Sequence, residues 1–212
     1  MKGGKALLKA LCDLRSTYGD LQSGNCLKIK LLLSFLEIEH EWKHVNILEK
    51  ETQTDDFLAI NPNGKIPTIV FDNGQVLSES NAILSFFAEH TDFLPETRFE
   101  KAKVFEWLFF EQYSHEPYIA VARFIQKYQG MPEDRIEEYH SLQTGGNKAL
   151  QIMELQLSKS PFLVGDRISI ADIALYAYTH VAHEGGFNLG NYPNIVKWLN
   201  RVSSMEGYVG ME

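Results

Sequence analysis

The sequence predicts a two-part chain, with an N-terminal α/β domain followed by an all-α domain. Up to about residue 90 the hydrophobic pattern alternates between strand and helix periods, whereas beyond residue 98 only helical patterns remain. Between them, TDFLPETR combines a proline with charges of both signs, as is typical of a linker. The expected boundaries are an N-terminal extension at 1–12, an α/β domain at 13–91, a linker at 92–98 and an all-helical domain at 99–212.

The first half has the order β-α-β, a short helix, a β-hairpin and a closing helix. The expected elements are strands at 14–18 and 42–48 around a helix at 26–36, a helix at 55–60, strands at 66–71 and 75–78, and a helix at 80–90. Because the first two strands enclose a helix, they should be parallel with a right-handed crossover. The hairpin follows from Asn73-Gly74 between two apolar runs, a pair that favours a type I′ turn.

The second half contains long helical patterns with clear boundaries. One pattern covers 99–129 and contains Pro117, where we expect a kink or break because proline cannot donate to the preceding turn. The segment SIAD at 169–172 predicts a capping box, with Asp172 in place of glutamate, that opens a helix. Pro193 is expected to open the last helix.

Composition places the chain among globular proteins and argues against two classes of partner. The 212 residues are 44% hydrophobic and 23% charged, and 20 Lys plus Arg against 28 Asp plus Glu give a net charge of −8. A net negative surface is repelled by nucleic acid and by anionic membranes. No apolar stretch approaches the ~18 residues of a membrane span. We therefore expect neither a nucleic-acid nor a membrane partner.

The N-terminal residues and the cysteines indicate a cellular compartment for the protein. Lysines interrupt the apolar residues of 1–12, so this segment lacks the apolar region of a signal peptide. Cys12 and Cys26 are too few for a disulfide scaffold and fit a reducing compartment. The expected location is the cytoplasm.

Three polar segments of the first half are candidate binding elements. In the loop YGDLQSGNC, Ser23 directly precedes a helix, whose free N–H groups attract anions. In NPNGKIPT, a cis Ile66–Pro67 bond would present the Ile66 backbone to an extended peptide. In SESNAI, Ser80 and the first amides of a helix suit a carboxylate, and Glu79 suits an ammonium group. Each alone is also explained by helix capping or strand geometry.

Together, NPNGKIPT, LSESNAIL and ISIADIALYAY resemble motifs of the glutathione transferase superfamily, in its bacterial and theta-like, serine-type branches. The resemblance covers nearly the whole chain. It implies a thioredoxin-like N-terminal domain, a C-terminal helical-bundle domain and a homodimer. It also implies glutathione as cosubstrate on the first domain, with no metal, and a site for a small hydrophobic electrophile.

The resemblance also implies roles for single residues. Ser23 would stabilise the glutathione thiolate, with Tyr18 as the rival hydroxyl and Asn25 as a second polar donor. The other expected glutathione contacts are Thr52, Lys65, Ile66, Pro67, Glu79 and Ser80. The expected contributors to the electrophile pocket are Tyr113, Tyr118 and Arg123, for which aromatic packing along a helix is the alternative.

The implied activity is conjugation of glutathione to small hydrophobic electrophiles, as in detoxification. Lowering a thiol pKa from about 8.5 by two units needs roughly 2.7 kcal/mol. One hydrogen bond to the thiolate gives about 1.5–3 kcal/mol and a helix end ~0.3–1, so no metal or general base is needed. Two alternatives stay open: a non-catalytic binding or interaction module, and a glutathione-dependent disulfide reductase or peroxidase.

A cysteine near the first helix and a pair of histidines in the second half are better explained by structure than by redox or metal chemistry. In Ser23-Gly24-Asn25-Cys26 a serine stands where redox CxxC motifs have the attacking cysteine, so Cys26 is expected to be a packed core residue. His180 and His183 lie three apart with Glu184 adjacent, but no further ligand is evident, and we expect no metal there.

Overall fold

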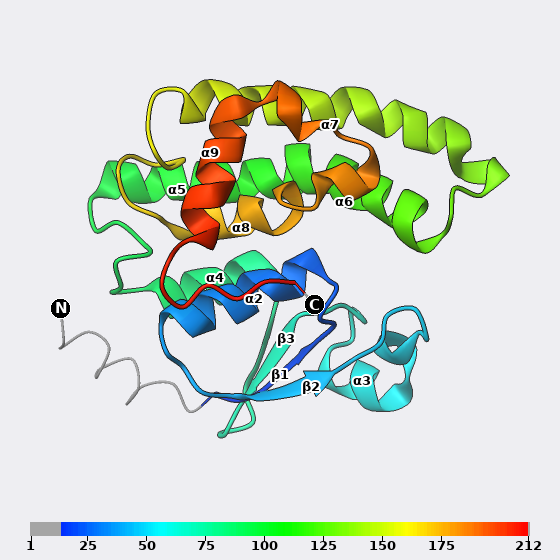
Figure 1. Cartoon of the computed structure of the whole chain (residues 1–212). Helices are drawn as coiled ribbons and strands as arrows, with labels where there is room; N and C mark the ends of the chain where they lie inside the picture. The colour runs from blue at the N-terminus through cyan, green and yellow to red at the C-terminus, as the bar shows by residue number, and fades with distance from the viewer. Residues whose placement is uncertain (1–13, 212) are drawn as a thin grey trace. The chain divides into compact units, whose positions relative to one another are not determined.

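The computed structural model describes residues 14–211, which divide into two compact units (Figure 1). One unit runs to Leu94 and takes in the C-terminal residues from Glu206, and the other spans Pro95–Met205. The C-terminal residues are held to the first unit by the Ser34 hydroxyl, which donates to the Gly207 carbonyl at 2.7 Å. The predicted fold class, an α/β unit and an all-helical unit, is confirmed.

The first unit is built on a four-stranded mixed sheet. In the order β2-β1-β3-β4 its strands are Glu41–His44, Leu14–Gly19, Thr68–Phe71 and Val76–Ser78. β1 and β2 are parallel, as predicted, with Ser16 opposite Glu41. β3 is antiparallel to both β1 and β4. The central strand β1 supplies the chain that leads into the first helix.

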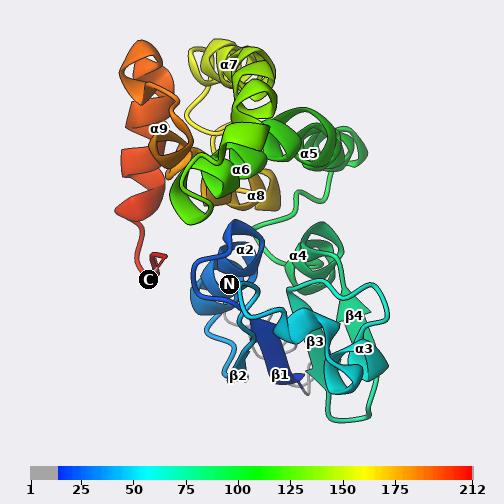
Figure 2. The ribbon, with the colours of Figure 1, turned by 90° about the vertical axis from the view of Figure 1, so that its right-hand side faces the viewer.

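Two helices of the first unit pack against each other beside the sheet. These are α2 (Gly24–Phe35) and α4 (Ser80–Ala88), which both views show side by side (Figures 1 and 2). Leucines 31–33 of α2 and Ile83 of α4 have no exposed surface. Burial of such side chains is the main stabilisation of the unit. It also brings the starts of the two helices close together.

The short helix α3 (Asp55–Ile60) contacts the sheet from the side opposite α2. A Cβ placed on Gly19 would lie 3.0 Å from Cys26 Sγ of α2, so Gly19 faces that helix. Successive strand residues point to opposite faces. Tyr18 accordingly contacts Phe57 of α3, with ring centroids 6.2 Å apart.

Two local details of the sheet differ from the prediction. The strand expected at 42–48 ends at His44, because the Asn46 side chain accepts from the amides of Leu48 and Glu49 and replaces strand pairing with a turn. The hairpin turn is not type I′. Only Gly74 has a positive φ there, +82°, and its amide donates to Phe71, as in a type I turn followed by a left-handed glycine.

Residues 95–205 form helices and loops only. The α-helices of this unit are α5 (Arg98–Phe110), α6 (Glu116–Arg123), α7 (Ile136–Leu157), α8 (Ile170–Thr179) and α9 (Pro193–Ser203). The irregularity expected at Pro117 lies in the turn before it, a π-helical segment at Glu111–His115. There the Glu116 amide donates to Glu111, five residues back, and Pro117 lies in the first turn of α6, where its missing N–H costs nothing.

The predicted capping box at the start of α8 is confirmed. The buried Asp172 carboxylate accepts from the Ser169 amide at 2.9 Å and from the Leu163 amide at 2.9 Å. It also accepts from Trp198 Nε1 at 3.0 Å, which ties α8 to α9. Within residues 14–211, none of the helices has the length and apolar character needed to cross a bilayer.

Candidate functional site

Ser23 caps the N-terminus of α2. Its backbone is extended, and its Oγ accepts from the Cys26 amide at 3.4 Å. Asp20 shapes the loop before it, accepting from the Ser23 amide through its carbonyl at 3.1 Å and from the Gln22 amide through its carboxylate at 2.8 Å. A hydroxyl that accepts in a cap keeps its own hydrogen for another acceptor. The Ser23 hydroxyl can therefore donate to an anion at this helix start.

Tyr18, the rival hydroxyl, points away from the start of α2. Its hydroxyl accepts from Lys43 Nζ at 3.5 Å, and the same ammonium lies 5.3 Å from the Tyr18 ring centroid. Its ring packs edge-on against Phe57 of α3. The alternation along β1 thus gives Tyr18 and Gly19 opposite faces of the sheet, and Gly19 faces α2.

Cys26 is part of the core, as expected. Its side chain is 1% exposed, and burial raises the pKa of the thiol to about 12, although a side-chain hydrogen bond with Ser23 acts in the opposite direction. At neutral pH this sulfur is a protonated, packed group. Cys12 lies outside the described residues.

The loop before β3 is held by an internal hydrogen-bond network. The Ile66–Pro67 bond is cis. Asn61 Nδ2 donates to the Lys65 carbonyl at 2.8 Å and to Thr68 Oγ1 at 3.1 Å, and Thr68 Oγ1 donates to the Lys65 carbonyl at 3.0 Å. The Lys65 side chain is exposed. Asn61 therefore fixes the backbone on which Lys65 and Ile66 stand.

Thr52 lies beside this loop. Thr52 is buried. The Gln53 side chain joins the segment at Thr52 to the loop at Gly64, because its Nε2 donates to Thr52 Oγ1 at 3.1 Å and to the Gly64 carbonyl at 3.3 Å. Gly64 has a φ of +60°, and a Cβ there would lie 2.5 Å from Gln53, so this close approach requires glycine. The structure thus brings Thr52 next to the loop that carries Lys65.

At the junction of β4 and α4, Glu79 and Ser80 have different surroundings. Glu79 is exposed and has a φ of +69°, a backbone conformation that is uncommon for non-glycine residues. Ser80 is buried, and its Oγ donates to Asn25 Oδ1 at 3.2 Å. Lys28 Nζ donates to Ser80 Oγ, also at 3.2 Å. The starts of α2 and α4 are therefore joined by side-chain hydrogen bonds.

Sequence reasoning missed two residues of this region, Asn61 and Lys28. Asn61 stands before Pro62, and the Asn63 amide donates to its side chain at 3.1 Å, a turn type for which asparagine is a known signal. Lys28 interrupts an otherwise apolar helix and is fully buried. A lysine within a run of core residues is the signal that would have identified it.

The three residues expected in an electrophile pocket have three different surroundings within the second unit. Tyr113 is 86% exposed. Tyr118 packs against α7, where a Cβ on Gly145 would lie 2.3 Å from its ring. Arg123 is buried and forms an ion pair with Glu184. The part of these three residues in an electrophile pocket stays a prediction.

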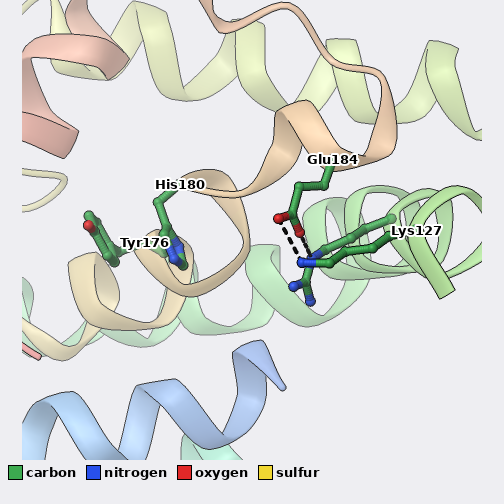
Figure 3. A network of polar contacts seen from close by, with 5 residues as sticks. Lys127, Tyr176, His180 and Glu184 are labelled. Atoms are coloured by element: carbon green, nitrogen blue, oxygen red, sulfur yellow. Dashed lines mark hydrogen bonds and ion pairs between the residues drawn. The ribbon is translucent and has the colours of Figure 1, made fainter. Parts of the chain in front are cut away.

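Glu184 is the centre of a polar network in this unit (Figure 3). It accepts from Arg123 Nε and, at 2.8 Å, from Lys127 Nζ. Burial opposes its ionisation, but the two cations outweigh burial and hold the pKa of Glu184 below its ordinary value. Nearby, His180 stacks on Tyr176 with ring centroids 4.8 Å apart, and burial lowers the pKa of His180.

His180 and His183 are not part of a potential metal-binding group among residues 14–211. The carboxylate of Glu184 is engaged by two cations. Across residues 14–211, no group of three or more His, Cys, Asp and Glu side chains could hold a metal ion.

Comparison with known proteins agrees with these motifs. Residues 22–90 match the glutathione S-transferase N-terminal domain, and residues 107–206 match the glutathione S-transferase C-terminal domain. A crystal structure of a glutathione S-transferase from Pseudomonas fluorescens Pf-5 is 58% identical, with a TM-score of 0.91, over 92% of this chain and 98% of that one. The chain belongs to the glutathione transferase superfamily.

Two further relatives of this transferase-family chain extend the comparison. The disulfide-bond oxidoreductase YfcG of Escherichia coli K12 is 30% identical over 184 residues, which are 84% of this chain and 85% of the relative. Another glutathione transferase family member from Pseudomonas fluorescens Pf-5, solved with two glutathione molecules bound, has a TM-score of 0.79 over 91% of this chain and 89% of that one. At 22% identity, that second likeness shows the shared fold alone.

Proposed function

We propose that this chain activates glutathione by stabilising its thiolate with the Ser23 hydroxyl, and transfers the sulfur to small hydrophobic electrophiles. The observation that carries the proposal is the position of Ser23 at the start of α2, with its hydroxyl hydrogen not used in the cap. Membership of the glutathione transferase superfamily supports glutathione as the cosubstrate.

The energy available at this position is sufficient for activation. A hydrogen bond to a charged group contributes about 1.5–3 kcal/mol. The start of α2 adds ~0.3–1 kcal/mol for an anion near its free amides. Together these lower a thiol pKa by about two units, which makes the thiolate abundant at neutral pH. In the reaction the thiol proton goes to solvent and the sulfur forms a bond to the electrophilic carbon. Either a leaving group departs with its bonding electrons, or a double bond opens and the resulting carbanion takes a proton from solvent.

The remaining glutathione contacts are proposed for residues of the same unit. The backbone of Ile66, before Pro67, pairs with the cysteinyl part of the tripeptide. Ser80 and the start of α4 bind the γ-glutamyl carboxylate, and Glu79 binds the γ-glutamyl ammonium group.

At the other end of the tripeptide, Lys65, with Thr52 beside its loop, binds the glycyl carboxylate. Asn25 supplies a second polar group near the sulfur. The Asn61 network that holds the Lys65 loop supports this arrangement.

We also propose self-association into a homodimer in the cytoplasm. Large aromatic side chains are exposed on helices of both units: Phe86 of α4 is 45% exposed, and Phe99 and Phe109 of α5 are 76% and 71% exposed. Exposed aromatic side chains of this size are available for contact with a second copy of the chain. Sedimentation of the purified chain tests this part, with a monomer as the contradicting result.

Disulfide reduction with glutathione is a second candidate, because YfcG is a disulfide-bond oxidoreductase. In this reaction the bound glutathione thiolate attacks one disulfide sulfur, a mixed disulfide forms, and the other sulfur leaves as a thiolate. The buried, protonated Cys26 takes no part. Both candidates therefore use the same activated glutathione.

One substrate panel tests these proposals. Purified protein is assayed with glutathione and a halodinitrobenzene, an unsaturated carbonyl compound, a mixed disulfide and a hydroperoxide, with Ser23→Ala as the matched control. We expect glutathione-dependent turnover of an electrophile that Ser23→Ala reduces. Turnover of the disulfide alone would favour the reductase. Binding of glutathione without any turnover would instead indicate a non-catalytic binding module.

A further inference from the structure

Lys28 is a buried cation at the contact between α2 and α4. It lies in the apolar helix α2, has no exposed surface, and donates from Nζ to Ser80 Oγ at 3.2 Å across the contact between α2 and α4. Lysine is almost never fully buried unless its charge has a partner, because leaving water is costly for an ammonium group. The hydrogen bond to Ser80 places this ammonium directly against the first residue of α4.

The hydrogen-bonding capacity of Ser80 indicates a role for Lys28. A serine hydroxyl has one hydrogen and two acceptor positions. In the structure the hydrogen is directed to Asn25 Oδ1, an amide oxygen that only accepts, and Lys28 occupies an acceptor position. Lys28 thus anchors the Ser80 oxygen, whereas the hydrogen, directed to Asn25, can turn to another acceptor without breaking the bond from Lys28.

A carboxylate arriving at the start of α4 would require that turn. Ser80 can donate to the carboxylate only if its single hydrogen leaves Asn25. Lys28 would hold the oxygen in place during the exchange, because it bonds to a lone pair and not to the hydrogen. Its positive charge and the amides at the start of α4 would both favour the anion.

We propose that Lys28 is a positioning residue for the γ-glutamyl α-carboxylate of glutathione, acting through Ser80. This inference rests on the proposed function, since it assigns the residue to the same glutathione site. The inference assigns two different roles to residues of the glutathione site. Ser23 acts on the sulfur, whereas Lys28 acts on the opposite end of the tripeptide and affects affinity without affecting thiol ionisation.

The test compares two ligands and matched variants of the full chain by calorimetry. The ligands are S-methylglutathione and the same compound with γ-aminobutyryl in place of γ-glutamyl, which lacks only the α-carboxylate. The variants are Lys28→Met, which keeps the length of an unbranched side chain, and Lys28→Gln, which keeps a donor and serves as the second variant if Lys28→Met does not fold. Lys30→Met is the control, because it removes the same charge from the same helix at a half-buried position.

We expect Lys28→Met to weaken S-methylglutathione binding by about tenfold, which corresponds to 1.4 kcal/mol, and to leave the γ-aminobutyryl analogue unaffected. Lys30→Met should change neither affinity. An equal loss of affinity for both ligands would show that Lys28 only supports the packing of α2 and α4, and no loss would show that Lys28 does not act on the ligand. Either result overturns the inference about Lys28. Binding of S-methylglutathione by the wild-type chain would still support the proposed glutathione site. Failure of the wild-type chain to bind S-methylglutathione would overturn both proposals.

Discussion

The ring of Phe187 lies where a side chain on Gly146 would have to be. A Cβ on this glycine of α7 would be 2.3 Å from Phe187 Cε1, and Phe187 is itself buried, so the ring has no free space to enter. Glycine normally weakens a helix interior by about 1 kcal/mol relative to alanine. Here it allows α7 and the segment around Phe187 to approach closely, which explains why a glycine pair interrupts neither the helix nor the core.

Gly146→Ala should therefore destabilise the protein, although alanine is the better helix former. Overpacking a core costs about 1–3 kcal/mol, which exceeds the gain in helix propensity. Chemical unfolding should show a lower free energy of unfolding for Gly146→Ala, and the added change Phe187→Leu should restore part of the loss. A single variant more stable than the wild-type chain would contradict the packing described.

Cys26 should resist alkylation in the folded protein. Burial raises the pKa of its thiol to about 12, so almost none is ionised at neutral pH, and its 1% exposure blocks access. Treatment with iodoacetamide followed by mass spectrometry should leave Cys26 unmodified unless denaturant is added. Labelling of the native chain at the rate of the denatured chain would show that Cys26 is a reactive thiol.

Glu184→Gln should lower stability at neutral pH and not in acid. The pKa of Glu184 is held below its ordinary value by Lys127 and Arg123, so its stabilisation is present above the unfolded pKa of about 4.3 and is lost as the pH falls through the folded pKa. Loss of hydrogen bonds between charged groups costs about 1.5–3 kcal/mol. Thermal unfolding of both proteins across this pH range measures the difference. A stability difference between the two proteins that persists at the lowest pH would contradict the stabilisation of the folded chain by ionised Glu184.

Most elements of the fold were predictable because their signals are local. The capping box needs only Ser169 and Asp172 three residues apart, and it is present in the structure. The strand around residue 45 was predicted too long, because nothing in its pattern shows that the Asn46 side chain takes over the amides that follow. The turn at Gly74 was predicted in the wrong class, because Asn-Gly is compatible with more than one hairpin loop.

The site was only partly predictable, because its decisive contacts are distant in sequence. The face of β1 that α2 covers is not predictable from the sequence, since alternation gives two faces but does not say which one is covered. The structure puts Tyr18 on the face away from α2, and the role of Ser23 stays a prediction. Lys28 was visible as a lysine in an apolar helix, but its partner Ser80 is 52 residues away. Only the packing of α2 against α4 reveals that pair.

The central claim is that the Ser23 hydroxyl stabilises the glutathione thiolate. The most direct test is an ultraviolet titration of bound glutathione in the wild-type protein and in Ser23→Ala and Tyr18→Phe, which gives the pKa of the bound thiol in each. We predict a wild-type pKa well below the free value of about 8.5, an increase of about one to two units in Ser23→Ala, and no change in Tyr18→Phe. An unchanged pKa in Ser23→Ala together with an increase in Tyr18→Phe would contradict the claim.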